Sequence, residues 1–93
     1  MELLTDDQIT AELAESPGWS LANGEITQTF ARKDFKDAML LVGAVAFLAE
    51  AANHHPDIDI RWNKVTLSLA THSAGGLTAA DFALARQISA LPQ

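Results

Sequence analysis

The chain has 93 residues, of which 48% are hydrophobic and 19% are charged, so a disordered chain is excluded and residues 1–93 are expected to form a single domain. It contains no cysteine, which excludes a disulfide scaffold, a zinc–thiolate site and a thiol nucleophile. Six Lys and Arg residues against twelve Asp and Glu residues give a formal net charge of −6, which disfavours binding to nucleic acid and to anionic membranes.

The start of the chain is acidic where an export signal would be basic. The longest apolar run covers residues 38–49, whereas a membrane-spanning helix needs roughly 20 apolar residues. We therefore expect a soluble, cytoplasmic protein.

The first predicted elements are a helix and a hairpin. A capping-box pattern at residues 5–8 predicts a helix that runs to about Ala14. The dipeptide Asn23-Gly24 is typical of a two-residue hairpin turn, and it joins two predicted strands, Trp19–Ala22 and Glu25–Ala31.

The second half of the chain repeats this order. A long helix is predicted for Asp34–Asn53, and a last helix begins at Thr78–Asp81. Between them, Ile58–Trp62 and Val65–Leu69 alternate in polarity and form a hairpin through Asn63-Lys64. One apolar face of this hairpin should be covered, and it consists of Ile58, Ile60, Trp62, Val65, Leu67 and Leu69.

The order helix, hairpin, helix, hairpin, helix predicts an α+β two-layer sandwich. Its four-stranded antiparallel sheet would consist of the two hairpins, with three helices on one face. Helix Asp34–Asn53 is apolar around its whole circumference, although such a domain buries only one side of it. We expect its other side to meet another subunit; burial by the N-terminal helix alone is the alternative.

Three histidines are the candidates for chemistry: His54 and His55 follow the long helix, and His72 follows the last strand. Their spacing leaves three interpretations open. They could cap a helix end or a turn, they could bind a metal together with Asp81, or they could transfer protons, since imidazole exchanges protons near neutral pH. The metal is disfavoured because adjacent histidines seldom bind one ion. Glu50, four residues before His54, could orient that ring or be a solvated helix carboxylate. Asp81 could orient His72, although a first-turn helix charge is the commoner role for such a residue.

A combination of short motifs resembles one known family. The pattern Glu-x-x-x-His-His-Pro at residues 50–56, Trp-Asn-Lys at residues 62–64, Thr-His at residues 71–72 and the downstream Asp81 is similar to the signature of the pterin-4a-carbinolamine dehydratases. The similarity covers nearly the whole chain. It implies the same four-stranded sheet with three helices on one face, and a homodimer or homotetramer that forms through helix 34–53.

The resemblance also implies a reaction. The substrate would be 4a-hydroxytetrahydropterin, the product quinonoid dihydropterin, and the role recycling of tetrahydrobiopterin after aromatic amino-acid hydroxylation, without a metal or an organic cofactor. His54, His55 and His72 would be the acid–base set, with Glu50 and Asp81 holding the imidazoles. The implied pterin-binding residues are Asn53, His54, His55, Ala70, Thr71, His72 and Ser73.

Two other classes of function compete with this one. Some members of the family act as partners of other proteins, and the long apolar helix could serve such a role. A metal-binding stress or storage protein is the third class. The presence of all three histidines favours the enzyme.

Overall fold

The computed structural model describes residues 2–92, which form helices and hairpins in the predicted order. The elements are α1 (Asp6–Ala14), β1 (Ser20–Ala22), β2 (Glu25–Ala31), α2 (Phe35–Ala52), β3 (Asp57–Arg61), β4 (Lys64–Leu69), a short 3₁₀ turn η1 (His72–Ala74), and α3 (Ala79–Ser89).

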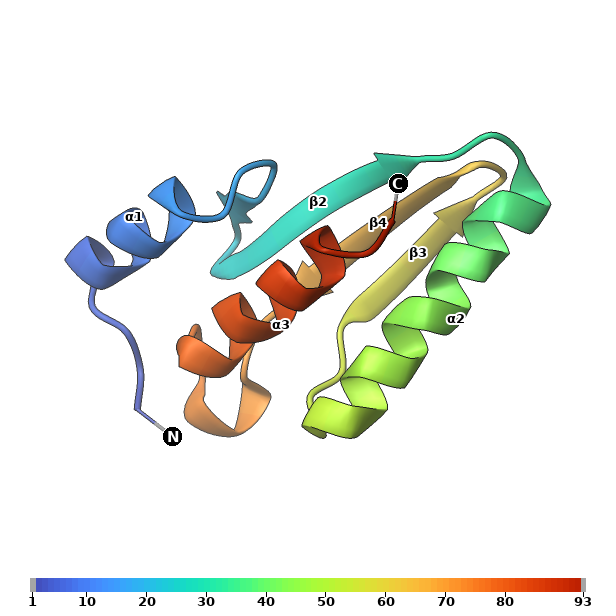
Figure 1. The fold of residues 1–93 in the computed structure, drawn as a ribbon. Helices are drawn as coiled ribbons and strands as arrows, with labels where there is room; N and C mark the ends of the chain where they lie inside the picture. The colour runs from blue at the N-terminus through green and yellow to red at the C-terminus, as the bar shows by residue number, and fades with distance from the viewer. Residues whose placement is uncertain (1, 93) are drawn as a thin grey trace.

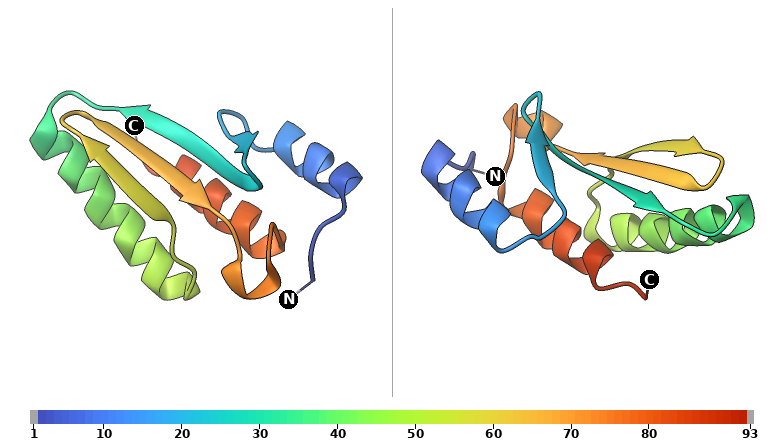
Figure 2. Two further views of the ribbon diagram at one scale, coloured as in Figure 1. Left: turned by 180° about the vertical axis from the view of Figure 1, so that it is seen from behind. Right: turned by 90° about the horizontal axis from the view of Figure 1, so that it is seen from above.

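The four strands form one antiparallel sheet in the order β1-β2-β4-β3. Helices α2 and α3 lie against one face of this sheet, and α1 continues the helical layer beside α3 at the β1 end (Figures 1 and 2). An ion pair between Glu12 and Arg86 joins α1 to α3. The predicted α+β two-layer architecture is therefore confirmed.

Local side-chain caps determine where the helices begin. Thr5 and Gln8 form a reciprocal capping box at α1, and Thr78 and Asp81 form another at α3. The Asp34 carboxylate accepts a 2.8 Å hydrogen bond from the Asp37 N–H at the start of α2. Each cap satisfies an N–H group that would otherwise lack a partner within the helix. These starts agree with the prediction because capping is encoded within four residues.

The core lies between the sheet and helices α2 and α3. Trp19 is 5% exposed, and its indole N–H donates to the Ser89 hydroxyl at 2.9 Å. The large side chains that are fully buried come from β2, β4, α2 and α3, and include Ile26, Val45, Val65, Leu67, Leu69, Phe82, Leu84 and Ile88.

The second hairpin differs from the prediction. Arg61 pairs with Lys64, so the turn consists of Trp62 and Asn63, and Trp62 has a left-handed φ of 50°. The Asn63 amide donates to the Arg32 carbonyl oxygen at 2.9 Å, which ties this turn to the segment before α2. In this position Trp62 is 65% exposed. Its predicted place in the covered face was wrong.

The rest of that face is covered unevenly. Val65, Leu67 and Leu69 on β4 are fully buried, Ile60 is half-buried, and Ile58 is exposed. Because β3 is an edge strand, its outer residues have a neighbouring strand on one side only.

Helix α2 buries one side against α3 and β4 and leaves the other uncovered. Ala38, Leu41, Val45 and Ala49 face the core. The exposed apolar side chains of the helix are Phe35, Met39, Leu40 and Phe47. Within residues 2–92, no helix combines the length and apolar character needed to span a membrane.

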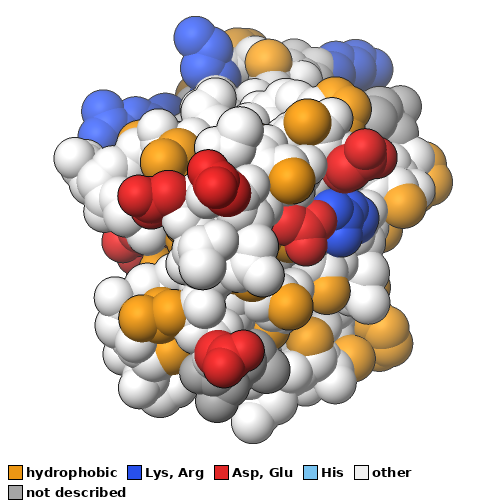
Figure 3. Space-filling model, turned by 90° about the vertical axis from the view of Figure 1, so that its left-hand side faces the viewer, with side chains coloured by type: hydrophobic (Ala, Val, Ile, Leu, Met, Phe, Trp, Pro, Cys, Tyr) orange, Lys and Arg blue, Asp and Glu red, His pale blue; other side chains and the backbone are white. Residues whose placement is uncertain are grey.

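The end of the molecule that carries α1, opposite to α2, has a surface of mixed charged and hydrophobic side chains (Figures 1 and 3). Figure 3 shows the face on the α1 side, where acidic side chains are spread among separate hydrophobic areas. This distribution agrees with the excess of six negative charges in the sequence.

Candidate active site

Two chain reversals bring the histidines to one end of the molecule. Asn53 ends α2 in a left-handed conformation with a φ of 50°, and the His54 N–H then donates to the Ala49 carbonyl oxygen at 3.0 Å. At the end of β4, Thr71 forms an isolated bridge with Gly76, and the loop between them contains η1. The first reversal places His54 and His55, and the second places His72.

The carboxylate of Asp81 joins these two loops to the start of α3. It is fully buried and accepts three hydrogen bonds: from His54 Nε2 at 2.5 Å, from the Thr71 hydroxyl at 2.9 Å and from the Thr78 backbone N–H at 2.9 Å. A buried carboxylate is tolerated only when such donors occupy its oxygens. Asp81 therefore fixes the positions of all three segments at once.

A second threonine extends this network. The hydroxyls of Thr71 and Thr78 lie 2.8 Å apart, and since the Thr71 proton goes to Asp81, Thr78 is the donor in this pair. The Thr78 oxygen also accepts from the Ala80 N–H at 3.3 Å. From the sequence, Thr78 was predicted only as the start of the last helix. One signal for its role was available in the sequence. Thr78 stands three residues before Asp81, which is capping-box spacing, and shortly after the threonine of the Thr-His motif.

The bond to Asp81 determines which nitrogen of His54 is free. Because Nε2–H donates to the carboxylate, a neutral His54 presents Nδ1 as a hydrogen-bond acceptor. The His54 side chain is 15% exposed, so it is shielded but reachable. The arrangement is that of a carboxylate-oriented imidazole that can accept a proton at Nδ1.

His55 has a different partner and a different environment. Its Nε2 lies 2.5 Å from Oε2 of Glu50, and both side chains are largely exposed, at 56% and 78%. Water and salt screen such a pair, so it positions the ring only weakly.

These two contacts differ from the candidate pairings of Glu50 with His54 and of Asp81 with His72. Asp81 does lie in the first turn of α3, as the alternative interpretation proposed. Spacing of four residues brings side chains together only while the helix continues. The left-handed residue Asn53 ends α2 before His54, so Glu50 meets His55 instead.

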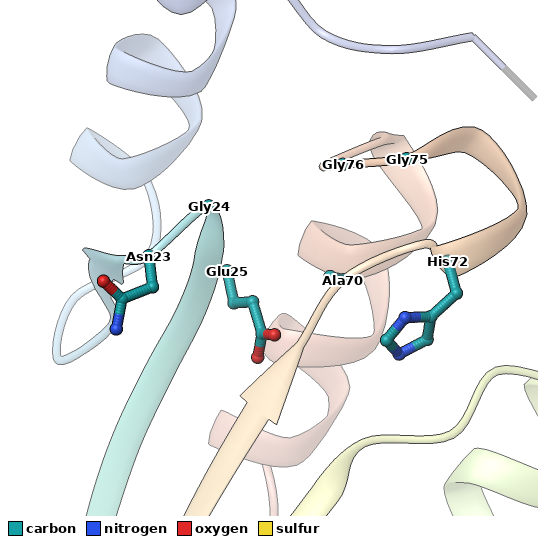
Figure 4. A pocket seen from close by; sticks show the side chains of 7 residues that line it. All are labelled: Asn23, Gly24, Glu25, Ala70, His72, Gly75 and Gly76. Carbon is teal, nitrogen blue, oxygen red and sulfur yellow. The ribbon is translucent and has the colours of Figure 1, made fainter.

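His72 is the first residue of η1, and its side chain is exposed. Within residues 2–92 its imidazole makes no hydrogen bond. It lines a cavity of about 290 Å³ between the β1–β2 hairpin and the loop after β4 (Figure 4). Ala70 also lines this cavity. This volume is close to the lower limit of typical small-molecule pockets, roughly 300–1,000 Å³.

The other predicted binding residues lie around these loops. Asn53 and Ser73 are exposed, at the end of α2 and in η1 respectively. Thr71 is 8% exposed and its hydroxyl is engaged by Asp81 and Thr78, so what it can offer a ligand is backbone. Over residues 2–92, no three His, Asp or Glu side chains lie close enough together to hold a metal ion.

Comparison with known proteins gives a consistent result. The profile of the family described as pterin 4 alpha carbinolamine dehydratase matches residues 2–91. A protein of Chloroflexus aurantiacus is 57% identical over 88 residues, which cover 95% of each chain. One of Roseiflexus castenholzii is 58% identical over 86 residues, 92% of each chain. Both carry the name "putative pterin-4-alpha-carbinolamine dehydratase".

Solved structures agree with this assignment. A crystal structure of a transcriptional coactivator/pterin dehydratase from Brucella melitensis superposes with a TM-score of 0.92 at 34% identity, covering 96% of this chain and 97% of the other. A pterin dehydratase-like protein described as a RuBisCO assembly factor in the alpha-carboxysome has a TM-score of 0.64 at 23% identity, covering 78% and 84%, and shows the fold alone. The chain described here belongs to the pterin-4a-carbinolamine dehydratase family, a family of hydro-lyases.

Proposed function

We propose that this protein dehydrates 4a-hydroxytetrahydropterin to quinonoid dihydropterin by histidine acid–base catalysis. The observation that carries the proposal is the 2.5 Å contact between His54 and the buried Asp81, in a network that continues through Thr71 to the backbone beside His72. The names of the relatives support the substrate class. Turnover of this substrate gives the protein a role in recycling tetrahydrobiopterin after aromatic amino-acid hydroxylation.

The reaction needs one acid and one base. The C4a–O bond breaks as the leaving hydroxyl takes up a proton and departs as water. N5 loses its proton, and the electron pair of the N5–H bond forms the new C4a=N5 double bond. No electrons are gained or lost, so two positioned imidazoles suffice.

The geometry favours different roles for the three histidines. His54 accepts the N5 proton at Nδ1, because the Asp81 carboxylate holds its other nitrogen and stabilises the imidazolium that forms. His72, which has no hydrogen bond to residues 2–92, donates to the leaving hydroxyl from the adjacent loop. His55, held by the exposed Glu50, positions the substrate. Asn53, Ser73 and the backbone at Ala70 and Thr71 border the place where the pterin binds.

The direct test is a dehydration assay on 4a-hydroxytetrahydropterin made by a hydroxylase or by synthesis. Wild-type protein should accelerate water loss above the uncatalysed rate, and the double variant His54→Ala, His72→Ala should return it close to that rate. A wild-type rate equal to the background would overturn the proposal. A protein that acts by binding other proteins would then be the better description.

We further propose that α2 joins two copies of the chain. Leu40 and Phe47 lie seven residues apart on the uncovered side of α2 and are 64% and 74% exposed. Gly43 lies between them, and a Cβ built on it would meet no atom within 4 Å, so a second helix can approach closely there. The apolar stripe formed by Leu40 and Phe47 can pack against the same stripe of a second, antiparallel or parallel helix, which favours a second copy of the chain as its partner.

A further inference from the structure

The cavity beside His72 has a second wall that the proposed mechanism does not use. The hairpin residues Asn23, Gly24 and Glu25 form this wall, and Ala70 and His72 stand across from it. Figure 4 shows the Glu25 carboxylate and the His72 imidazole extending from two different elements on either side of Ala70. The cavity thus has a carboxylate on one side and an imidazole on the other.

The strand register fixes Glu25 in this place. Ile26 pairs with Leu69, so the preceding residue Glu25 lies beside the end of β4, where Ala70 leads into the Thr-His motif. The turn before it is a tight two-residue turn, because Asn23 and Gly24 have φ values of 54° and 77°, the pair of left-handed residues that a type I′ hairpin requires, and Ala22 pairs with Glu25 across it. Glu25 is therefore held by the sheet and not by a mobile loop.

The Glu25 carboxylate has unused hydrogen-bonding capacity. The residue is half-buried, yet within residues 2–92 its carboxylate makes no hydrogen bond and no ion pair. A carboxylate that is partly removed from water favours a ligand that supplies donors. A carboxylate that was fully exposed would need no such ligand, because water would supply the donors.

The backbone N–H groups of the opposite wall are engaged within the loop. The Gly75 N–H donates to the carbonyl oxygens of Thr71 and His72, and the Gly76 N–H donates to that of Thr71. Two amide groups that could have bound an acceptor are thus used within the loop. The Glu25 carboxylate is an acceptor with no partner within residues 2–92, so its side of the cavity suits a ligand edge that carries donors.

We propose that Glu25 binds the edge of the pterin ring formed by N3–H and the 2-amino group. These two donors lie side by side with the spacing of a guanidinium fork, which a carboxylate accepts in a bidentate manner. The edge lies on the pyrimidine ring, away from the C4a–N5 bond. Glu25 on the hairpin wall would therefore turn the reacting bond toward the histidine loops. This inference rests on the proposed function for its ligand and adds Glu25 as its substrate-binding and specificity-determining residue.

The test compares two ligands and three proteins. The probes are 6,7-dimethylpterin and 6,7-dimethyllumazine, in which an oxygen replaces the 2-amino group, and affinity is measured by fluorescence titration without turnover. The proteins are wild type, Glu25→Gln and the matched control Glu15→Gln, which removes the same charge at the exposed end of α1. Wild type should bind the pterin about tenfold more tightly than the lumazine, and Glu25→Gln should lose this preference while Glu15→Gln keeps it. In turnover, Glu25→Gln should raise KM and change kcat little.

Each outcome either supports or overturns the binding of the pterin edge by Glu25. A wild-type protein that binds both ligands equally overturns the inference, and this measurement needs no variant to fold. A Glu25→Gln variant with wild-type affinity and preference overturns it as well, even if the enzyme dehydrates its substrate normally. Pterin preference that depends on Glu25, in a protein without dehydratase activity, supports the inference and refutes the proposed function alone.

Discussion

Replacing Asp81 by Asn is the most informative perturbation of the site, because it removes a charge while preserving shape. Asp81 is fully buried and accepts from His54, Thr71 and the Thr78 N–H. Asparagine has one acceptor oxygen, and its amide nitrogen only donates. If the oxygen keeps the two threonines, the NH₂ group faces His54 Nε2, which must then become the acceptor.

The consequence for catalysis is a change of tautomer. A neutral His54 with an acceptor at Nε2 carries its proton on Nδ1, so it presents a donor to the substrate where the mechanism needs a base. The loss expected from such a mismatch is about 10²–10⁴-fold in kcat/KM. Asp81→Ala would add unsatisfied donors at Thr71 and Thr78, so it would confound activity with folding.

The cost in stability should be smaller than the cost in rate. Asp81→Asn exchanges three charge-assisted hydrogen bonds for neutral ones but also removes a buried charge, so the net cost is about 1–2 kcal/mol. In a domain of this size that lowers Tm by roughly 5–15 °C and leaves the protein folded at 25 °C.

The assay measures dehydration at 25 °C beside a thermal melt, with Asp7→Asn as a control of equal chemistry in the exposed first turn of α1. The control should keep its activity and shift Tm by no more than about 4 °C. A folded Asp81→Asn protein whose kcat/KM stays within threefold of wild type would refute the assignment of His54 as an Asp81-oriented base.

Three further outcomes follow from the same geometry. His72→Ala should lose about 10²–10⁴-fold in rate with little change in Tm. His54→Ala should lower both the rate and Tm, because it leaves Asp81 short of a donor, and equal Tm values for the two variants would contradict this. Phe47→Glu should shift sedimentation at micromolar concentration from an oligomer to a monomer, and a wild-type monomer would argue against the α2 interface. Treatment with a chelator should leave dehydration and Tm unchanged, and stoichiometric zinc needed for activity would contradict the mechanism.

Most of the fold could be predicted because its signals are local. The capping residues Thr5, Asp34 and Thr78 each act within one helical turn, and Asn23-Gly24 supplies the two left-handed residues of a type I′ turn. The second turn was misplaced because its first residue, Trp62, is a bulky side chain in a left-handed conformation, where sequence patterns favour Asn or Gly. The pairing of Asn63 with Arg32 that accompanies it is not local.

The pairings within the site could not be predicted from spacing. Asp81 meets His54 across 27 positions, because α3 packs beside α2 and the αL residue Asn53 redirects the chain. Glu25 was read only as the first residue of a strand, since its approach to Ala70 depends on the pairing of β2 with β4. Helix periodicity has no information about contacts that the sheet register creates.

The buried carboxylate links the stability of the fold to the chemistry of the site. Asp81 completes the capping box of α3, a role that an exposed Asp or Glu also performs at many helix starts. Because this one is buried, its charge is costly unless every strong acceptor position is occupied, and the hydroxyl of Thr71 and the ring of His54 provide the missing donors. The capping residue Asp81 therefore accepts hydrogen bonds from an imidazole at the end of α2 and from a hydroxyl after the end of β4. A chain of 93 residues can thus orient an imidazole without a separate supporting element, since the start of α3 already holds it.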